Sequence, residues 1–139
     1  MIQVVWFKKD LRVADHLVLR LACAAGPVLP LDVFEPETMM AGDYSAQHYG
    51  FIRESLLSLE QQLHNIGLRL VTKHASMLEV LASLLSEFKD FSLFSHEETG
   101  NAMSFQRDIA VGLWCQAKGI TWQEFASVGV VRRLKSRDR

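Results

Sequence analysis

The chain has 139 residues, of which 49% are hydrophobic and 22% are charged, which is the composition of one globular domain rather than of a disordered segment. Its apolar runs fall well short of the roughly 18 residues that span a bilayer, and no basic stretch precedes a long apolar run at the N-terminus. We therefore expect a cytoplasmic protein with no membrane contact and no secretory signal. Cys23 and Cys115 lie in apolar helical patterns, and we expect them to be core residues of a reduced protein.

The first elements along the chain alternate between strand and helix. A continuous apolar run over residues 2–7 predicts a strand that is buried on both faces. Residues 17–25 have a helical pattern, which Gly26 closes, and residues 28–34 form a second apolar strand. Residues 35–44 contain Pro and Gly and are expected to form a loop.

A long helix is predicted over residues 45–65, because its apolar residues are spaced three or four apart and would form one buried stripe. The stripe consists of Ile52, Leu56, Leu59, Leu63 and Ile66. Gly67 is expected to provide a left-handed C-cap. A third strand follows over residues 68–72.

The second half of the chain continues the alternation. Ser76 and Glu79 have the spacing of a capping box and predict the start of the next helix. A strand is expected over residues 91–95, a long helix over 104–118 and a last strand over 120–125. The side chains predicted to face inward are Met77, Leu81, Leu84 and Phe88 in the first of these helices, and Phe105, Ile109 and Leu113 in the second.

Five strands that alternate with four helices predict an α/β fold, a three-layer sandwich with a five-stranded parallel sheet and helices on both faces. Trp6, Trp114 and Trp122 are expected to be large buried side chains in this fold. We place the domain at residues 1–131 and a basic tail at residues 132–139.

The net charge of −1 hides an asymmetry between these two parts. The tail over residues 132–139 has five basic and one acidic side chain, which leaves residues 1–131 with ten basic and fifteen acidic ones, a balance of −5. A net charge of −5 on residues 1–131 disfavours the binding of nucleic-acid phosphates. The tail is either a solvated terminus or interdomain linker, or an arm that binds nucleic acid.

The strand order predicts where a ligand would bind. An open parallel sheet binds ligands beyond the carboxyl ends of its strands, at the point where the strand order reverses. For five strands wound outward from the first, that point lies between the first and the fourth strand. The loops that leave these strands begin at Lys8 and His96, and they are the two most polar loops between predicted elements.

The loop after the first strand contains no glycine, which excludes a P-loop or a GxGxxG dinucleotide site. Its charged residues leave two interpretations open. Asp10 and Arg12 either pair with neighbours to fix the loop or face a ligand, and Asp15 either caps the following helix or does the same. Lys8 and Lys9 are expected to face a ligand or water.

The loop after the fourth strand places two adjacent carboxylates, Glu97 and Glu98, at the reversal point. Carboxylates accept hydrogen bonds from the N–H groups of a heterocycle such as a pterin or a deazaflavin. Alternatively, Glu98 or Asn101 only caps the last helix. The spacing fits no zinc motif. Arg107 and Asp108 are one residue apart, so we expect each to pair with a loop or a partner surface rather than with the other.

Four blocks of sequence, in this order, closely resemble the N-terminal domain of the DNA photolyase/cryptochrome family. The blocks are VVWFKKDLRVADHLVLRLA, PLDVFEPE, SHEETGNAMSFQRDIAV and GITWQEFASVGVVRRLKSRD. The resemblance covers the whole chain and implies a Rossmann-like antenna domain, which holds or helps to hold an accessory chromophore. That chromophore would be a reduced folate, a deazaflavin or FMN.

The resemblance also implies a larger helical domain that this chain lacks. In the family that domain binds FAD, docks on DNA and splits pyrimidine dimers by light-driven electron transfer, or signals in the cryptochromes. The residues for FAD and for the DNA lesion have no counterpart here, so the chain alone is not expected to be catalytic. The alternative functions are a free-standing nucleotide-binding module and a protein-interaction module of the same fold.

The resemblance implies a set of residues for the antenna crevice. The loop after the second strand and the start of the long helix would wall it, with Phe34, Glu35, Pro36, Gln47 and Phe51. Lys9 and Asp10 would form its floor. Folate-binding relatives place polar contacts at the positions of Glu97, Glu98 and Asn101.

Overall fold

The computed structural model describes five segments of the chain, and in part of them the backbone alone. The segments are residues 1–8, 17–35, 46–96, 102–125 and 135–136. The side chains of residues 46–53, 102–104 and 135–136 are outside the description.

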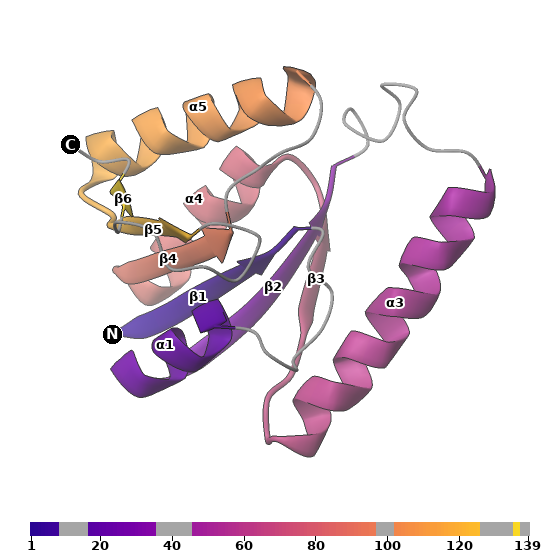
Figure 1. Ribbon diagram of the computed structural model, residues 1–139. Helices are drawn as coiled ribbons and strands as arrows, with labels where there is room; N and C mark the ends of the chain where they lie inside the picture. The colour runs from indigo at the N-terminus through magenta and orange to yellow at the C-terminus, as the bar shows by residue number, and fades with distance from the viewer. Residues whose placement is uncertain (9–16, 36–45, 97–101, 126–134, 137–139) are drawn as a thin grey trace.

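A six-stranded sheet in the order β3-β2-β1-β4-β5-β6 forms the centre of the molecule (Figure 1). Its first five strands are β1 (Ile2–Phe7), β2 (Val28–Phe34), β3 (Val71–His74), β4 (Phe91–His96) and β5 (Trp122–Phe125). All neighbouring pairs among these five are parallel. The strand order reverses between β1 and β4, which confirms the predicted topology.

A sixth strand was not predicted. β6 (Lys135–Ser136) pairs antiparallel with β5, with Lys135 opposite Glu124. A two-residue strand within a basic run has no hydrophobic period, so sequence pattern could not find it. The domain boundary at residue 131 stays a prediction, since residues 126–134 lie outside the described segments.

Two strands begin later than predicted. Leu68 and Leu70 pack into the core of the sheet, but pairing with β2 starts at Val71, so residues 68–70 form a connection. At the other strand, the N–H of Ile120 donates to the carbonyl of Cys115 at 2.9 Å. This bond caps the C-terminus of the preceding helix, so Ile120 lies in the connection after it, and β5 starts at Trp122.

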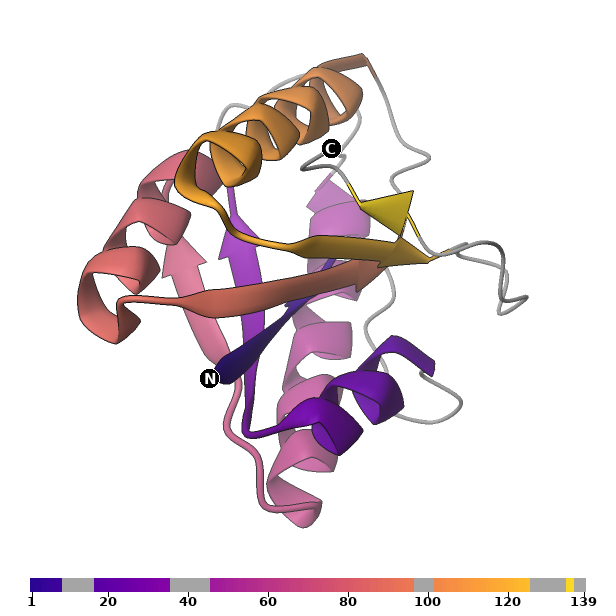
Figure 2. The same cartoon turned by 90° about the vertical axis from the view of Figure 1, so that its left-hand side faces the viewer.

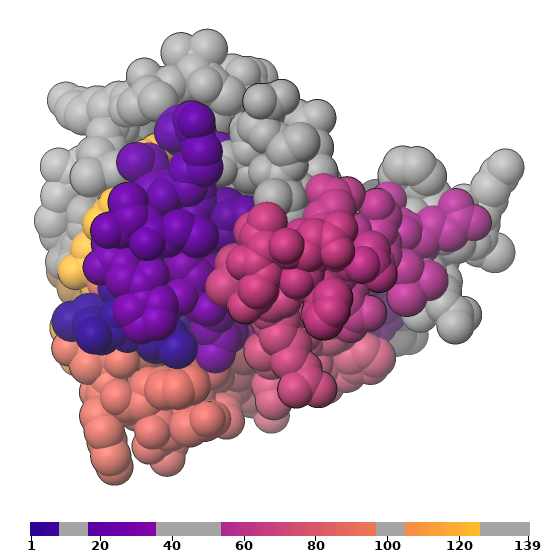
Figure 3. Space-filling model, turned by 90° about the horizontal axis from the view of Figure 1, so that it is seen from below, coloured from indigo at the N-terminus to yellow at the C-terminus, as the bar shows by residue number. Residues whose placement is uncertain are grey.

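Helices cover both faces of the sheet, as predicted. α1 (Leu17–Ala25) and α3 (Ala46–Asn65) lie on one face, and α4 (Met77–Phe88) and α5 (Ala102–Lys118) on the other (Figure 2). Seen from below, α1 lies beside α3 (Figure 3).

Local chemistry sets the helix ends. Ser76 Oγ accepts the N–H of Glu79 at 3.3 Å and donates to the Glu79 carboxylate at 2.9 Å, which confirms the capping box. Gly67 and Gly119 have φ angles of 84° and 72°, a conformation that favours glycine. α4 ends instead at Lys89, with a left-handed φ of 69°.

Each helical layer encloses its own apolar core. Trp6 and Trp122 are buried under α4 and α5, with the predicted inner face of α4. Leu59 and Leu63 are fully buried under α3. Two predictions about single residues are wrong, because Ile66 is exposed at the end of α3 and Cys23 is exposed on α1.

The predicted inner face of α5 is also wrong. Phe105, Ile109 and Leu113 are exposed, whereas Val111 and Cys115 are completely buried. The helix carries two apolar stripes, and a hydrophobic period alone cannot choose between them. The choice follows from Asp108, which lies on the same side as Val111 and Cys115 and is held there by an ion pair.

Candidate functional site at the carboxyl edge of the sheet

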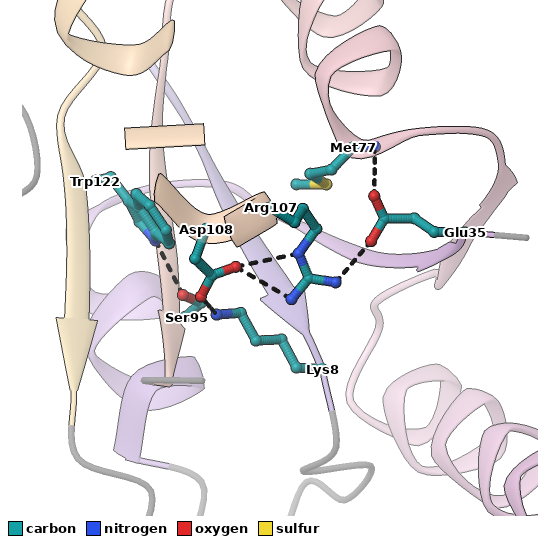
Figure 4. A network of polar contacts seen from close by, with 7 residues as sticks. All are labelled: Lys8, Glu35, Met77, Ser95, Arg107, Asp108 and Trp122. Carbon is teal, nitrogen blue, oxygen red and sulfur yellow. Dashed lines mark hydrogen bonds and ion pairs between the residues drawn. The ribbon is translucent and has the colours of Figure 1, made fainter. Parts of the chain in front are cut away.

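A network of charged and aromatic side chains lies at the carboxyl ends of the central strands (Figure 4). It takes residues from six elements or their ends: Lys8 after β1, Glu35 after β2, Met77 in α4, Ser95 in β4, Arg107 and Asp108 in α5, and Trp122 in β5. Parallel strands end at the same edge of a sheet, so residues far apart in the sequence meet here.

Asp108 is the centre of the network. Its Oδ2 lies 2.6 Å from Lys8 Nζ, and both side chains are almost fully buried, at 2% and 5% exposure. Its Oδ1 accepts from Arg107 Nε at 3.1 Å and lies 3.1 Å from Arg107 Nη2. The expectation that these two neighbours would not pair is therefore wrong, because the long Arg107 side chain folds back to the carboxylate beside it.

Arg107 and Glu35 extend the network along the edge of the sheet to the end of β2 and the start of α4. Arg107 Nη1 lies 2.6 Å from Glu35 Oε1, and Glu35 Oε2 accepts the N–H of Met77 at 3.0 Å. A carboxylate at the first turn of a helix is favoured by the helix dipole. Glu35 therefore ties the end of β2 to the start of α4 and to α5.

Two tryptophans flank the cations. Lys8 Nζ lies 4.4 Å from the ring centroid of Trp6 and 5.5 Å from that of Trp122, and the guanidinium carbon of Arg107 lies 4.8 Å from Trp6. The two indole rings are 5.9 Å apart and inclined by 36°. Trp122 donates its indole N–H to Ser95 Oγ at 2.9 Å. Such cation–π contacts add to the ion pairs in a buried environment.

The charges of this network balance within the protein. Two cations, Lys8 and Arg107, face two carboxylates, Glu35 and Asp108, at 2.6 to 3.1 Å. Lys8 faces Asp108 and the indole rings rather than a ligand or water, so that prediction is wrong. The network joins the ends of β1 and β2 to α4 and α5.

The structure describes only some of the residues that were predicted to line the antenna crevice. Phe34 ends β2 and is half-buried, with its ring centroid 5.2 Å from that of His74 at the end of β3. Gln47 and Phe51 lie in α3, where the backbone alone is described. Six predicted site residues lie outside the described residues: Lys9, Asp10, Pro36, Glu97, Glu98 and Asn101.

Asp32 is a candidate site residue that the sequence analysis missed. Leu31 and Val33 pack into the core under α4 and α5, so by alternation Asp32 and Phe34 point to the face of α1 and α3. Asp32 is only 8% exposed, and this burial raises its pKa to about 6, while the positive charge of nearby His74 opposes the shift. Its signal in the sequence is a single acid within the apolar run VLPLDVF.

An open groove lies between β3 and α4, and His74 is one of the residues that line it. It has a volume of about 440 Å³ and is lined by Leu29, Val71, Val80, Leu84 and Phe88, with Lys73, Glu79 and Glu87 exposed at its walls.

In the segments that the structure describes, no three His, Cys, Asp or Glu side chains gather as metal ligands. No helix among those segments is long and apolar enough to cross a membrane.

Comparison with known proteins identifies the family. The model of the DNA photolyase family matches residues 3–135, nearly the whole chain. The chain belongs to the DNA photolyase family. Cryptochrome-1 of Arabidopsis thaliana is 38% identical over 128 residues, which are 88% of this chain and 18% of that protein. A deoxyribodipyrimidine photo-lyase of Agrobacterium fabrum is 35% identical over 85 residues, 60% of this chain and 17% of that protein.

Solved structures of the family agree with the fold. A class III photolyase from Agrobacterium tumefaciens superposes with a TM-score of 0.79 at 28% identity, over 90% of this chain and 25% of that one. A cryptochrome of Synechocystis gives a TM-score of 0.76 at 17% identity, over 91% and 27%. The chain thus corresponds to the N-terminal α/β domain of the family and spans about a fifth of the length of the curated relatives named above.

Proposed function

We propose that this domain binds an antenna chromophore at the carboxyl edge of its sheet, on the face that α3 covers. The ligand would be a flat heterocycle, namely a reduced folate, a deazaflavin or FMN. The observation that carries the proposal is the pair of rings, Phe34 and His74, beside the buried acid Asp32 at the ends of β2 and β3. Together they offer two aromatic rings, inclined by 33°, next to a hydrogen-bonding group, a combination that small-molecule sites commonly use.

The free-energy cost of burying Asp32 supports a role for this residue in ligand binding. Burial raises the pKa of Asp32 to about 6, so its ionised form destabilises the empty protein at neutral pH. Residues that reduce stability without a partner are enriched at functional sites. A carboxylate at this position can accept a hydrogen bond from the N–H of a heterocycle.

The proposed residues divide into four roles. Phe34 and Phe51 stack on the ring system. The polar contacts come from Lys9, Asp10, Glu97, Glu98 and Asn101, and Pro36 with Gln47 completes the wall. Glu35 would support the site without contacting the ligand, because both of its carboxylate oxygens already bond to Arg107 and Met77.

The catalytic function belongs to the longer family architecture in this proposal. FAD, contact with DNA and light-driven splitting of pyrimidine dimers, or signalling, would reside in a helical domain outside these 139 residues. The purified chain should therefore fold but show no photorepair of dimer-containing DNA. Light-dependent repair by this chain alone would contradict the proposal.

A titration with a matched pair of variants tests the site. FMN, a deazaflavin and a reduced folate are each titrated against wild type, Glu98→Ala and Glu54→Ala, and binding is followed by fluorescence. A charge-assisted hydrogen bond contributes about 1.5–3 kcal/mol, so Glu98→Ala should weaken binding roughly ten- to a hundred-fold. Glu54 is exposed on α3 and is not among the proposed contacts, so its variant should bind like wild type. Equal affinities in all three proteins would remove Glu98 from the site.

A further inference from the structure

β3 forms an open edge of the sheet. It is the last strand on its side in the order β3-β2-β1-β4-β5-β6, and among the described strands it pairs with β2 alone (Figure 1). Three of its four residues, Thr72, Lys73 and His74, are exposed, whereas five of the six residues of β1 are buried. Within the described segments, no strand lies beside the outward N–H and C=O groups of β3. Such an edge can pair with an extended segment of another chain.

The groove between β3 and α4 follows this edge. On the α4 side it is lined by Val80, Leu84 and Phe88, whose spacing of four residues places them in one row along the helix. On the other side β3 contributes Val71 and Lys73, which the alternation of a strand places on the same face. An apolar groove therefore runs beside a strand edge that has no partner among the described strands.

The charges at the walls of the groove are unequal. Glu79 and Glu87, exposed on α4, are two acidic side chains, whereas Lys73 on β3 is one basic side chain. The two glutamates are eight residues apart on a helix, which is about 12 Å along its axis. In an extended chain, residues four positions apart are separated by about 13 Å and point to the same face. An extended segment with basic residues at two such positions, and an apolar residue midway between them, would complement both the walls and the floor.

We propose that the β3 edge binds an extended peptide segment of a partner protein, which adds a strand to the sheet and turns a basic–x–apolar–x–basic pattern toward α4. Main-chain hydrogen bonds to β3 supply affinity, and the alternate side chains supply specificity. The acidic walls of the groove attract the two basic residues. This proposal does not depend on the binding of a chromophore, which would take place on the face that α3 covers.

A second copy of this chain is a poorer occupant of the same edge. Antiparallel pairing of β3 with β3 of another copy would place the two α4 helices on the same face of the joined sheet. Glu79 and Glu87 of both copies would then lie along one groove. Like charges brought together in this way disfavour the pairing.

Binding of a designed peptide to the 139-residue chain tests the proposal. The probe is the peptide TKTITKT with blocked ends, which has lysines four positions apart and an isoleucine midway. Chemical shifts of the protein amides locate the contact and give the affinity. The charge-reversal variant is Glu87→Lys, and the matched control is Glu60→Lys, which changes an exposed carboxylate on α3. Glu79 is left unchanged, because its carboxylate also takes part in the cap of α4.

The probe should shift the amides of Val71 to His74, and it should bind wild type and Glu60→Lys equally. Glu87→Lys should bind it at least about threefold more weakly, because the substitution replaces an attraction with a repulsion. The peptide TETITET should show the reverse order and prefer Glu87→Lys to wild type. Equal affinity of the probe for wild type and Glu87→Lys would overturn the proposal, as would the absence of shifts in β3 at about 1 mM peptide.

Methylation of the peptide nitrogens tests strand pairing itself. Alternate N–H groups of a strand point to opposite edges. One peptide is methylated at the nitrogens of its two central threonines, and the other at those of isoleucine and the second lysine. One of them should bind at least about tenfold more weakly than the probe, and the other should bind like it. Equal effects of the two methylations would mean that no strand is added, and would overturn the proposal. A dimer of the free chain with exchange-protected β3 amides would assign the edge to a second copy and overturn it as well.

Discussion

Replacement of Asp108 by asparagine should be among the most damaging single changes in this domain. Asn has the shape of Asp but no charge, so Asp108→Asn would remove the carboxylate charge that lies 2.6 Å from Lys8, a cation at 5% exposure. Removing one partner of a buried ion pair costs about 3–5 kcal/mol, because the remaining charge is still desolvated. Arg107 would also lose its carboxylate contacts at 3.1 Å.

The assay is urea unfolding followed by tryptophan fluorescence, since Lys8 lies within 5.5 Å of the rings of Trp6 and Trp122. A loss of about 3–5 kcal/mol would lower Tm by roughly 10–17 °C in a protein of this size. Glu87→Gln, which changes an exposed carboxylate on α4, should have an effect below about 0.5 kcal/mol. A double variant, Lys8→Met with Asp108→Asn, should recover part of the loss. A loss below about 1 kcal/mol for Asp108→Asn would refute the buried pair.

Three further predictions concern the same edge and its supports. Arg107→Lys keeps the charge but cannot reach Asp108 and Glu35 together, so it should cost about 1–3 kcal/mol in urea unfolding. Because burial raises the pKa of Asp32 from 3.8 to about 6, its contribution of about 3 kcal/mol is present below pH 3.8 and lost as pH rises through 6. Asp32→Asn should therefore remove this loss and raise Tm at pH 7, whereas an unchanged pH profile would contradict the assignment. Ser76→Ala should cost about 1 kcal/mol through loss of the α4 cap, and a neutral result in thermal unfolding would argue against that cap.

The elements and their order could be predicted from sequence because they depend on local chemistry and on period. Gly67 and Gly119 stop helices through positive φ, and Ser76 starts one through its cap. The strand order followed from the right-handed winding of parallel strands. The ends of β3 and β5 were less accessible, because they depend on where pairing with a neighbouring strand begins.

The polar network could not be predicted, because most of its contacts join residues that lie between 27 and 100 positions apart in the sequence. Lys8 and Asp108 meet only after the sheet and α5 have packed. The prediction of the inner face of α5 failed for the same reason. Two apolar stripes satisfy the helical period, and the ion pair of Asp108 decides between them. Asp32 was overlooked because an acid within a strand carries no periodic signal of its own.

If this domain holds a light-absorbing antenna chromophore, the purified protein should retain one on a column. The 139-residue chain is incubated separately with FMN, a deazaflavin and a reduced folate, passed over a size-exclusion column, and followed at the visible or near-ultraviolet band of each ligand. At least one of the three should elute with the protein at about one molecule per chain, and excess AMP should not displace it. Elution of the protein without any of the three would contradict the antenna assignment, as would complete displacement by AMP, which would favour a nucleotide-binding module.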